Sequence, residues 1–171
     1  ALDRGDLGAL AAAGALATLA GHRHRARWAV AGVERPLPLL PDARVAEGVP
    51  LLRGPTTGEG VVADYASLGL SLGPHPLALL REALARRGVQ PAESLWECAD
   101  GALVHVAGVV TTRQRPGSAA GVVFVTLEDE TGCVNLVVWQ RVAARQRQPL
   151  LAARLLAALG RVQRHGDVLH V

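Results

Sequence analysis

The chain has 171 residues, half of them hydrophobic, and a formal net charge of +3 at pH 7, so it can hold one medium domain or two small ones with ample material for a core. Arg and His interrupt its Ala/Leu-rich start, and no charge-free apolar run reaches the roughly 18 residues of a membrane span. Cys98 and Cys133 lack the spacing of a zinc site and the density of a secreted disulfide scaffold, which predicts a cytoplasmic protein with inert thiols.

Positive charge is concentrated in the C-terminal part. All 18 basic residues are Arg, a bias that a genome rich in G and C produces without selection for Arg chemistry. Residues 103–171 hold eight Arg against four acidic residues, net +4, whereas residues 1–102 hold ten Arg against eleven acidic residues, net −1. This excess fits contact with phosphates, although many solvated surfaces reach a similar charge. The chain contains no Met, and we expect it to be a piece of a longer protein.

The N-terminal region, residues 1–33, is predicted to be helical. Leucines recur at three- and six-residue intervals over residues 6–20, and Asp3 or Asp6 can cap this helix. A second helix begins at residues 22–28, where His and Arg fill the first turns, the end at which the helix dipole disfavours cations. Either a bound anion or solvent compensates this charge.

A linker and a connector follow. Residues 34–60 contain five prolines and four glycines and are predicted to be extended. Within them, Leu37, Leu39 and Leu40 form a short apolar peptide that suits docking into a groove of a partner, unless the leucines pack back onto their own domain. Residues 61–100 return to helix and connect the linker to the next domain.

Residues 101–171 have the element order of a small β-barrel. The predicted segments are strands 103–114, 122–128 and 133–139, a helix over 140–153, and strands 154–164 and 168–171. This is the order of the five-stranded Greek-key barrel called the OB-fold, which binds oligonucleotides across its second and third strands and with the loops beside them. The chain is therefore predicted to be an α+β protein, an OB-fold barrel preceded by helical segments and a Pro/Gly-rich linker.

The strand over residues 122–128 places an aromatic ring on the outside of the sheet. Alternation turns Val123, Val125 and Leu127 toward a core and Phe124 outward. An exposed Phe in mid-strand is disfavoured unless something covers it. The cover is either a stacked nucleic-acid base or a neighbouring loop or helix of the same protein.

Phosphate contacts are expected from basic residues in the loops that frame this face. These residues are Arg113 and Arg115 in the first loop and Arg161, Arg164 and His165 beside the last turn. The arginines of the predicted helix, at positions 141, 145 and 147, fit a solvated face equally well.

Eight segments carry a family resemblance. They are Ala13–Leu16, Leu19–Arg23, Asp64–Tyr65, Gly69–Leu72, His75–Pro76, Val106–Val110, Arg113–Gly117 and Phe124–Gly132. In this order they resemble the C-terminal part of bacterial C-family replicative DNA polymerases. The Arg-Gln-Arg-Pro-Gly loop and the Leu-Glu-Asp-Glu-Thr-Gly turn are similar more narrowly to the error-prone branch, the damage-inducible mutasome polymerase.

This resemblance implies that residues 1–33 are the tail of a helix-hairpin-helix region that grips duplex DNA and that residues 101–171 lie near the single-stranded template. The family's catalytic carboxylates, with their Mg²⁺, lie in a palm domain that would precede Ala1, so no catalytic residue, metal or cofactor is expected here. The implied partners are DNA, a Y-family-like subunit and a RecA-like subunit. The sliding clamp would be reached indirectly, because residues 36–40 lack the opening Gln of a clamp-binding peptide.

The hairpin also resembles the anticodon-binding barrels of class II aminoacyl-tRNA synthetases, in which the Phe of a Phe-x-x-Leu-x-Asp strand stacks a base and an amide on the next strand reads its edge. Phe124 and Asn135 occupy these places. The sequence thus predicts a non-catalytic, single-stranded DNA-binding module of an error-prone translesion polymerase acting in the SOS response. The alternatives are a module that docks onto mutasome subunits or the clamp, and a free-standing tRNA binder.

Overall fold

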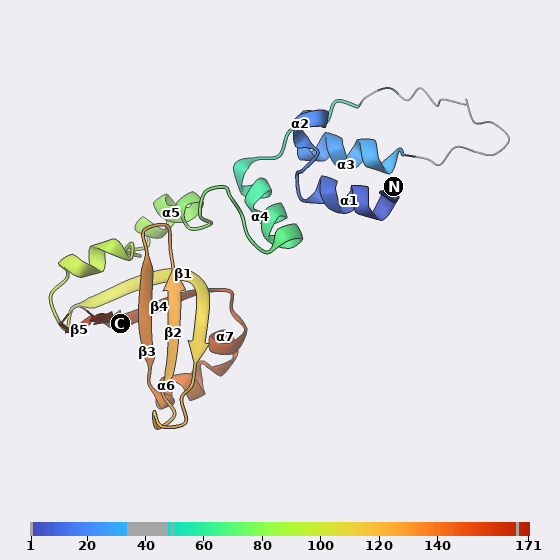
Figure 1. Cartoon of the computed structure of the whole chain (residues 1–171). Helices are drawn as coiled ribbons and strands as arrows, with labels where there is room; N and C mark the ends of the chain where they lie inside the picture. The colour runs from blue at the N-terminus through green and yellow to red at the C-terminus, as the bar shows by residue number, and fades with distance from the viewer. Residues whose placement is uncertain (1, 34–47, 49, 167) are drawn as a thin grey trace. The chain divides into compact units, whose positions relative to one another are not determined.

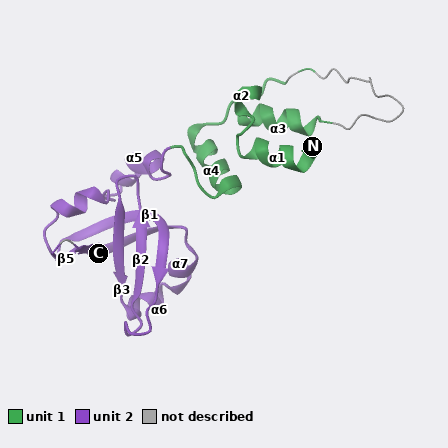
Figure 2. Cartoon of the chain, in the orientation of Figure 1, with its two compact units in different colours: residues 1–73 green, residues 74–171 purple. Residues whose placement is uncertain are grey.

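The computed structural model describes residues 2–33, 48, 50–166 and 168–171, which form two compact units (Figures 1 and 2). Unit 1, residues 1–73, is helical, and unit 2, residues 74–171, contains the sheet. None of the helices in the described ranges is long and apolar enough to cross a membrane.

The described residues of unit 1 form four helices. They are α1 (Arg4–Ala12), α2 (Ala17–Ala20), α3 (Arg23–Ala31) and α4 (Thr57–Leu68). The single helix predicted over residues 6–20 is therefore two helices, because Gly14 adopts a φ of +80° that ends the first one. Asp3 caps α1 and exchanges hydrogen bonds with Asp6. Helix α4 begins inside the range predicted as linker, because Thr56 and Glu59 form a second reciprocal cap.

A thin apolar core and one ion pair hold unit 1 together. The buried residues of the core are Ala11, Ala26 and Val30. Arg23 of α3 forms an ion pair with Asp64 of α4 and donates to the carbonyl oxygen of Gly60 at 2.9 Å. Ser71 donates to the other oxygen of Asp64 at 2.6 Å, and the hydrogen bonds from Ser71 and Arg23 lower the pKa of Asp64. Polar ties therefore supplement a core made of small side chains.

Unit 2 pairs six strands in one sheet. Its elements are the 3-10 helices η1 (Ala78–Leu80) and η2 (Glu93–Glu97), the helices α5 (Arg81–Ala85), α6 (Gln140–Arg145) and α7 (Arg147–Ala152), and the strands β1 (Leu103–Gln114), β2 (Val123–Glu128), β3 (Cys133–Val138), β4 (Leu155–Arg161), β5 (Gln163–His165) and β6 (Val168–His170). The sheet order is β4-β1-β2-β3-β6-β5, in which only β3 and β6 run parallel. The prediction of a closed five-stranded barrel is wrong for the described residues, since this ladder of six strands stays open.

The extra strand arises at Val162. The strand predicted over residues 154–164 is interrupted there, because the backbone N–H of Val162 donates to Ala102 and its carbonyl accepts from Gly101. The Val162 side chain is fully buried. Strands β4 and β5, the two edges of the sheet, are therefore consecutive in the chain with one core residue between them.

The core of unit 2 is aliphatic and lies between the sheet and the segments that cover its ends. It includes Val104, Val106, Val125, Leu127 and Leu136. The alternation predicted for β2 is confirmed, since Val123, Val125 and Leu127 are buried while Phe124 and Glu128 are exposed.

Gly108 lets β1 cross closely over β2. A Cβ atom at this position would lie 2.7 Å from the Cβ of Leu127 and 2.9 Å from two backbone atoms of Glu128. Neither neighbour is the flexible end of a side chain, so only a residue without a Cβ fits here.

We therefore expect Gly108→Ala to lower the free energy of unfolding by about 1–3 kcal/mol through overpacking. Urea denaturation measures this loss as a lower transition midpoint. Gly117→Ala is the matched control, because nothing lies within 4 Å of the position its Cβ would take. Equal midpoints for the two variants would show that β1 can shift to accept a Cβ atom at Gly108 without loss of stability.

Candidate nucleic-acid interface

Phe124 lies on the outward face of the three central strands. Its neighbours across the sheet are Gln114 of β1 and Val137 of β3. Phe124 is 36% exposed, so its side chain is not buried in the core of unit 2. The outward position predicted for Phe124 is confirmed.

Two polar side chains continue this face. Thr126 of β2 faces Asn135 of β3, and the Thr126 hydroxyl donates to the Asn135 side-chain oxygen at 3.0 Å. This bond orients the amide and leaves its NH₂ group available to another acceptor. Asn135 is exposed and pairs with His170 of β6 on its other side. Phe124, Thr126 and Asn135 thus combine a π-face with hydrogen-bonding groups, as contact with an unpaired base requires.

A β-bulge separates Arg113 from this face. The pairing of β1 with β2 shifts by one residue between Val110 and Thr112, so Thr111 and Thr112 are both exposed and Arg113 turns inward. There its guanidinium donates to the carbonyl oxygen of Leu150 at 2.6 Å and to that of Ala153. Arg113 therefore ties the end of α7 to β1, and its contact with phosphate stays a prediction.

Arg115 remains exposed just beyond β1, at the same end of the sheet as Phe124. A pocket of about 490 Å³ opens beside it, between the β1–β2 loop and helices α6 and α7. Its polar lining residues are Arg113, Gln114, Arg115, Gln140 and Arg147. From the sequence, Arg147 fitted a solvated helix face equally well, and only the three-dimensional structure brings it to this loop.

The β1–β2 loop ends in two residues with a left-handed backbone conformation. Ala120 has a φ of +46° and Gly121 a φ of +82°, and Ala is an uncommon residue in that region. A Cβ on Gly121 would lie 3.0 Å from the Gln140 side chain. Gly121 therefore allows α6 to approach the loop and close one wall of the pocket.

The other predicted phosphate ligands lie at the opposite end of β1. Arg161 pairs with Leu103, the first residue of β1, whereas Phe124 pairs with Gln114, its last residue. Because β1 has twelve residues, its two ends are roughly 36 Å apart along the chain. Arg161 donates to the carbonyl oxygen of Gly101 at 2.9 Å. The five predicted basic residues are therefore not gathered on one side of the ring.

Arg164 is also used within the fold. It donates to the carbonyl oxygens of Trp96 at 2.5 Å and Cys98 at 3.3 Å, and its guanidinium carbon lies 5.9 Å from the centre of the Trp96 ring. His165 is exposed on β5, close to it in sequence. Leu37, Leu39 and Leu40, predicted to bind a partner, lie outside the described residues.

The acidic turn between β2 and β3 holds segments of unit 2 together through hydrogen bonds and ion pairs. Asp129 is only 6% exposed and accepts hydrogen bonds from the backbone of Ala92, Thr131 and Gly132 and from Arg81 at 3.0 Å. Arg81 also pairs with Glu130. Burial by itself raises the pKa of Asp129, but the hydrogen bonds outweigh it and the pKa is lowered. The pKa of Glu130 is lowered mainly by its hydrogen bond from Arg81.

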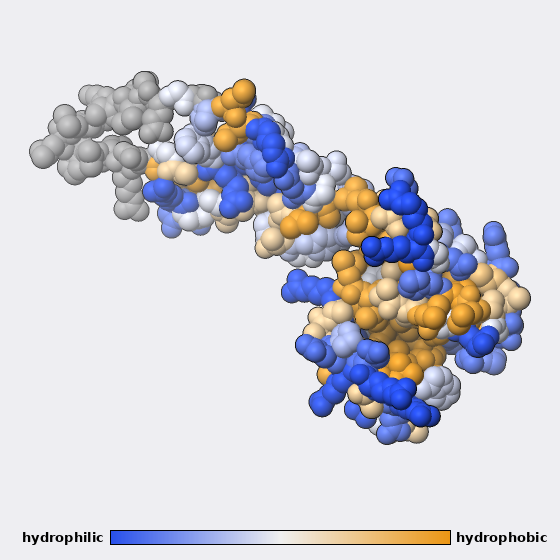
Figure 3. Space-filling model, turned by 180° about the vertical axis from the view of Figure 1, so that it is seen from behind, coloured by the Kyte–Doolittle hydropathy of each residue, from blue (hydrophilic) through white to orange (hydrophobic). Residues whose placement is uncertain are grey.

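A second outward face, formed by the first half of β1 and by β4, is apolar. Leu103, Leu155 and Leu159 are all more than half exposed on it. Apolar residues also gather on the side of unit 2 that Figure 3 shows. This face offers no aromatic ring and differs in chemistry from the Phe124 face.

Residues 104–171 match the family described as the OB-fold nucleic acid binding domain. Over 170 residues, 99% of the chain, the sequence is 56% identical to the error-prone DNA polymerase of Methylococcus capsulatus (strain Bath), of which it covers 16%. The corresponding proteins of Alkalilimnicola ehrlichii and Azoarcus sp. (strain BH72) are 55% and 54% identical over 171 residues, and the chain covers 17% and 16% of them. The chain is related to error-prone DNA polymerases over its whole length.

The chain spans about one sixth of these error-prone DNA polymerases. The match over residues 104–171 begins at the second residue of β1 and includes Phe124, Asn135 and the acidic turn. The residues of the outward face described above therefore lie within the part of the chain that matches the nucleic-acid-binding family.

Arg113, which is hydrogen-bonded within the fold, and Arg115, which is exposed, allow a matched comparison of stability. We expect Arg113→Ala to lower the free energy of unfolding by on the order of 2–3 kcal/mol, because two carbonyl oxygens at the end of α7 lose a charged donor. Arg115→Ala should change it by less than about 0.5 kcal/mol, as for other exposed positions. Urea denaturation of both variants measures the difference, and equal stability would place Arg113 outside the structural framework.

The acidic turn makes stability depend on pH. Because the folded-state pKa values of Asp129 and Glu130 are lowered, their stabilisation is complete above the ordinary carboxyl pKa near 4 and is lost as the pH falls through the lowered values. Asp129→Ala should cost on the order of 3 kcal/mol at pH 7 and flatten the fall in stability below about pH 4. Denaturation at several pH values measures this, with Glu128→Ala, an exposed neighbour, as the control. An Asp129→Ala variant with the wild-type pH profile would contradict this stabilising role of the acidic turn.

Proposed function

We propose that the chain is a single-stranded DNA-binding module of an error-prone DNA polymerase and holds the unpaired template. The observation that carries this proposal is the exposed Phe124 ring on the outward face of the central strands, within residues that match a nucleic-acid-binding family. Stacking on an aromatic ring accepts every base, because every base has a π-face. A polymerase that copies any sequence needs this tolerance.

In this proposal each group near the ring has a role. A base stacks on Phe124, and the Asn135 amide, oriented by Thr126, meets a polar edge of that base or of its neighbour. The phosphates lie toward Arg115 and Arg147, at the pocket beside the β1–β2 loop. Arg161 and Arg164 have partners within the fold and contribute to the positive field more than to direct contacts.

Translesion synthesis during the SOS response is the role proposed for the whole polymerase, because the relatives are named error-prone DNA polymerases. Phosphoryl transfer with Mg²⁺ belongs in this proposal to parts of the polymerase outside the chain. The Y-family-like and RecA-like subunits implied by the family resemblance are the proposed protein partners, with the clamp reached through them.

Protein docking is the second candidate function, and the apolar β1–β4 face favours it. Strand β4 is an edge strand whose residues 155–160 carry no charge and no proline, whereas edge strands are usually protected by such residues. An extended segment of another mutasome subunit would add to this edge and cover Leu155 and Leu159.

Binding of a labelled oligothymidylate tests the DNA-binding proposal. Phe124→Ala should weaken binding by about 1–3 kcal/mol, a roughly 5- to 150-fold rise in Kd, while Phe124→Trp should retain affinity. Arg115→Ala and Arg147→Ala should each reduce the slope of log K against log salt concentration by about 0.7, the value for one phosphate contact to a single strand.

Leu159→Ala is the matched control, since Leu159 is exposed on the β1–β4 face. It should leave DNA binding unchanged and weaken capture of a mutasome subunit if docking is the second function. Unchanged affinity in Phe124→Ala, or binding insensitive to salt, would reject the DNA-binding role. Stronger binding of an RNA hairpin loop than of the oligothymidylate would favour a tRNA-type function instead.

A further inference from the structure

One face of α3 in unit 1 carries a second combination of aromatic and basic side chains. His24, Arg27, Trp28 and Ala31 recur at three- and four-residue spacing, so they lie on the same side of the helix. The strand-like segment at Leu52 and Arg53 passes beside this face. Together these six residues line a pocket of about 430 Å³, a volume within the roughly 300–1,000 Å³ of small-ligand sites.

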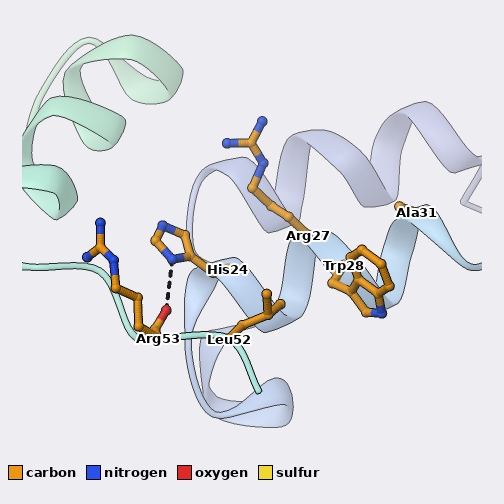
Figure 4. Close-up of a pocket in the computed structure, with 6 residues that line it drawn as sticks. All are labelled: His24, Arg27, Trp28, Ala31, Leu52 and Arg53. Carbon is orange, nitrogen blue, oxygen red and sulfur yellow. Dashed lines mark hydrogen bonds between the residues drawn. The ribbon is translucent and has the colours of Figure 1, made fainter. Parts of the chain in front are cut away.

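The pocket has an apolar floor and a basic edge. In Figure 4 the Trp28 ring lies near Ala31, and Leu52 lies between Trp28 and the basic groups of His24 and Arg53. The Arg27 guanidinium extends from the same helix on the basic side. Trp28 is 51% exposed, so half of the largest aromatic side chain in this unit faces the pocket and solvent.

The basic groups around the pocket differ in how far the fold already uses them. The carbonyl oxygen of Arg53 only accepts, so His24 donates to it from Nδ1 at 2.9 Å and keeps Nε2 available. The Arg53 guanidinium pairs with Glu59 at 2.5 and 2.8 Å. Within the part of the chain that the structure describes, Arg27 makes neither a hydrogen bond nor an ion pair.

Arg27 and Trp28 are both exposed on α3. Arg23, one turn before Arg27 on the same helix, is paired with Asp64 and nearly buried, which shows how α3 uses an arginine for structure. An exposed Trp beside a cation that has no ion-pair partner among the described residues instead matches the two requirements of single-stranded nucleic-acid binding, a stacking surface and a charge for the backbone.

We infer that this pocket is a second nucleic-acid site, which takes one unpaired nucleotide. The base stacks on Trp28 over Leu52 and Ala31, and the adjoining phosphate lies between Arg27 and His24, with Arg53 at the edge. The site does not depend on the proposed role of Phe124, because it belongs to the other unit and uses none of its residues.

An acidic peptide is the competing ligand for an apolar and basic surface. A peptide that binds in extended form by strand addition needs main-chain partners as well, and the chain beside the pocket has already given the carbonyl oxygens of Leu52 and Arg53 to His22 and His24. A nucleotide needs only a flat ring and cations, which are the groups that remain.

Fluorescence of Trp28 tests the inference in the full chain. Trp96→Phe and Trp139→Phe leave Trp28 as the sole tryptophan, and Phe124→Ala removes the proposed stacking residue of unit 2. Addition of an oligothymidylate should quench Trp28 with saturation and with lower affinity at higher salt. Arg27→Ala should reduce the salt slope by about 0.7, whereas Arg87→Ala, an exposed arginine outside the pocket, should not.

The outcomes separate the two sites. Quenching that persists with Phe124→Ala supports the α3 site whatever Phe124 does, and absence of quenching overturns it. Equal quenching by an oligoglutamate of the same charge also overturns it in favour of a peptide. If circular dichroism shows that the substituted chain is unfolded, the wild-type chain is irradiated with a bromodeoxyuridine oligonucleotide. A cross-link at Trp28 then supports the site, and a cross-linked protein without one there rejects it.

Discussion

Strand β1 is shared by two neighbours, and its shape decides what each end of unit 2 presents to solvent. Its first half pairs with β4 and its second half with β2, so the strand must bend between them. Gly108 permits the close crossing over Leu127, and the bulge at Thr111 reverses which side chains point outward. As a result the apolar β1–β4 face and the Phe124 face are distinct surfaces at opposite ends of one strand.

The bulge also explains which parts of the site could be predicted from the sequence. Phe124 was placed correctly because β2 alternates without interruption, and a period of two is visible in the sequence. Arg113 was not, because an extra residue in a Thr-Thr pair leaves no signal in composition, yet it turns the arginine inward. The roles of Arg147 and Arg164 depend on contacts with segments distant in sequence, which no local pattern contains.

The helical unit shows the same division between local and distant information. The start of α1 follows from the cap predicted at Asp3, whereas the cap formed by Thr56 and Glu59 lies in a range that was predicted to be linker. The break at Gly14 was missed, because Ala-rich helices tolerate single glycines and only the φ of +80° marks the turn. The arginines of α3 look alike in sequence, but Asp64 neutralises Arg23 and leaves Arg27 without a partner among the described residues.

The placement of aromatic side chains separates framework from contact surface in this protein. The chain has one Phe, one Tyr and three Trp, and all five are at least 36% exposed, while both cores are aliphatic. Aromatic rings usually dominate cores, whereas here the cores contain none and the rings lie at the surface. Trp96 is covered by Arg164, whereas Phe124 and Trp28 lie near the exposed arginines Arg115 and Arg27. Rings beside cations that the fold does not use are the arrangement that an unpaired nucleic-acid strand recognises.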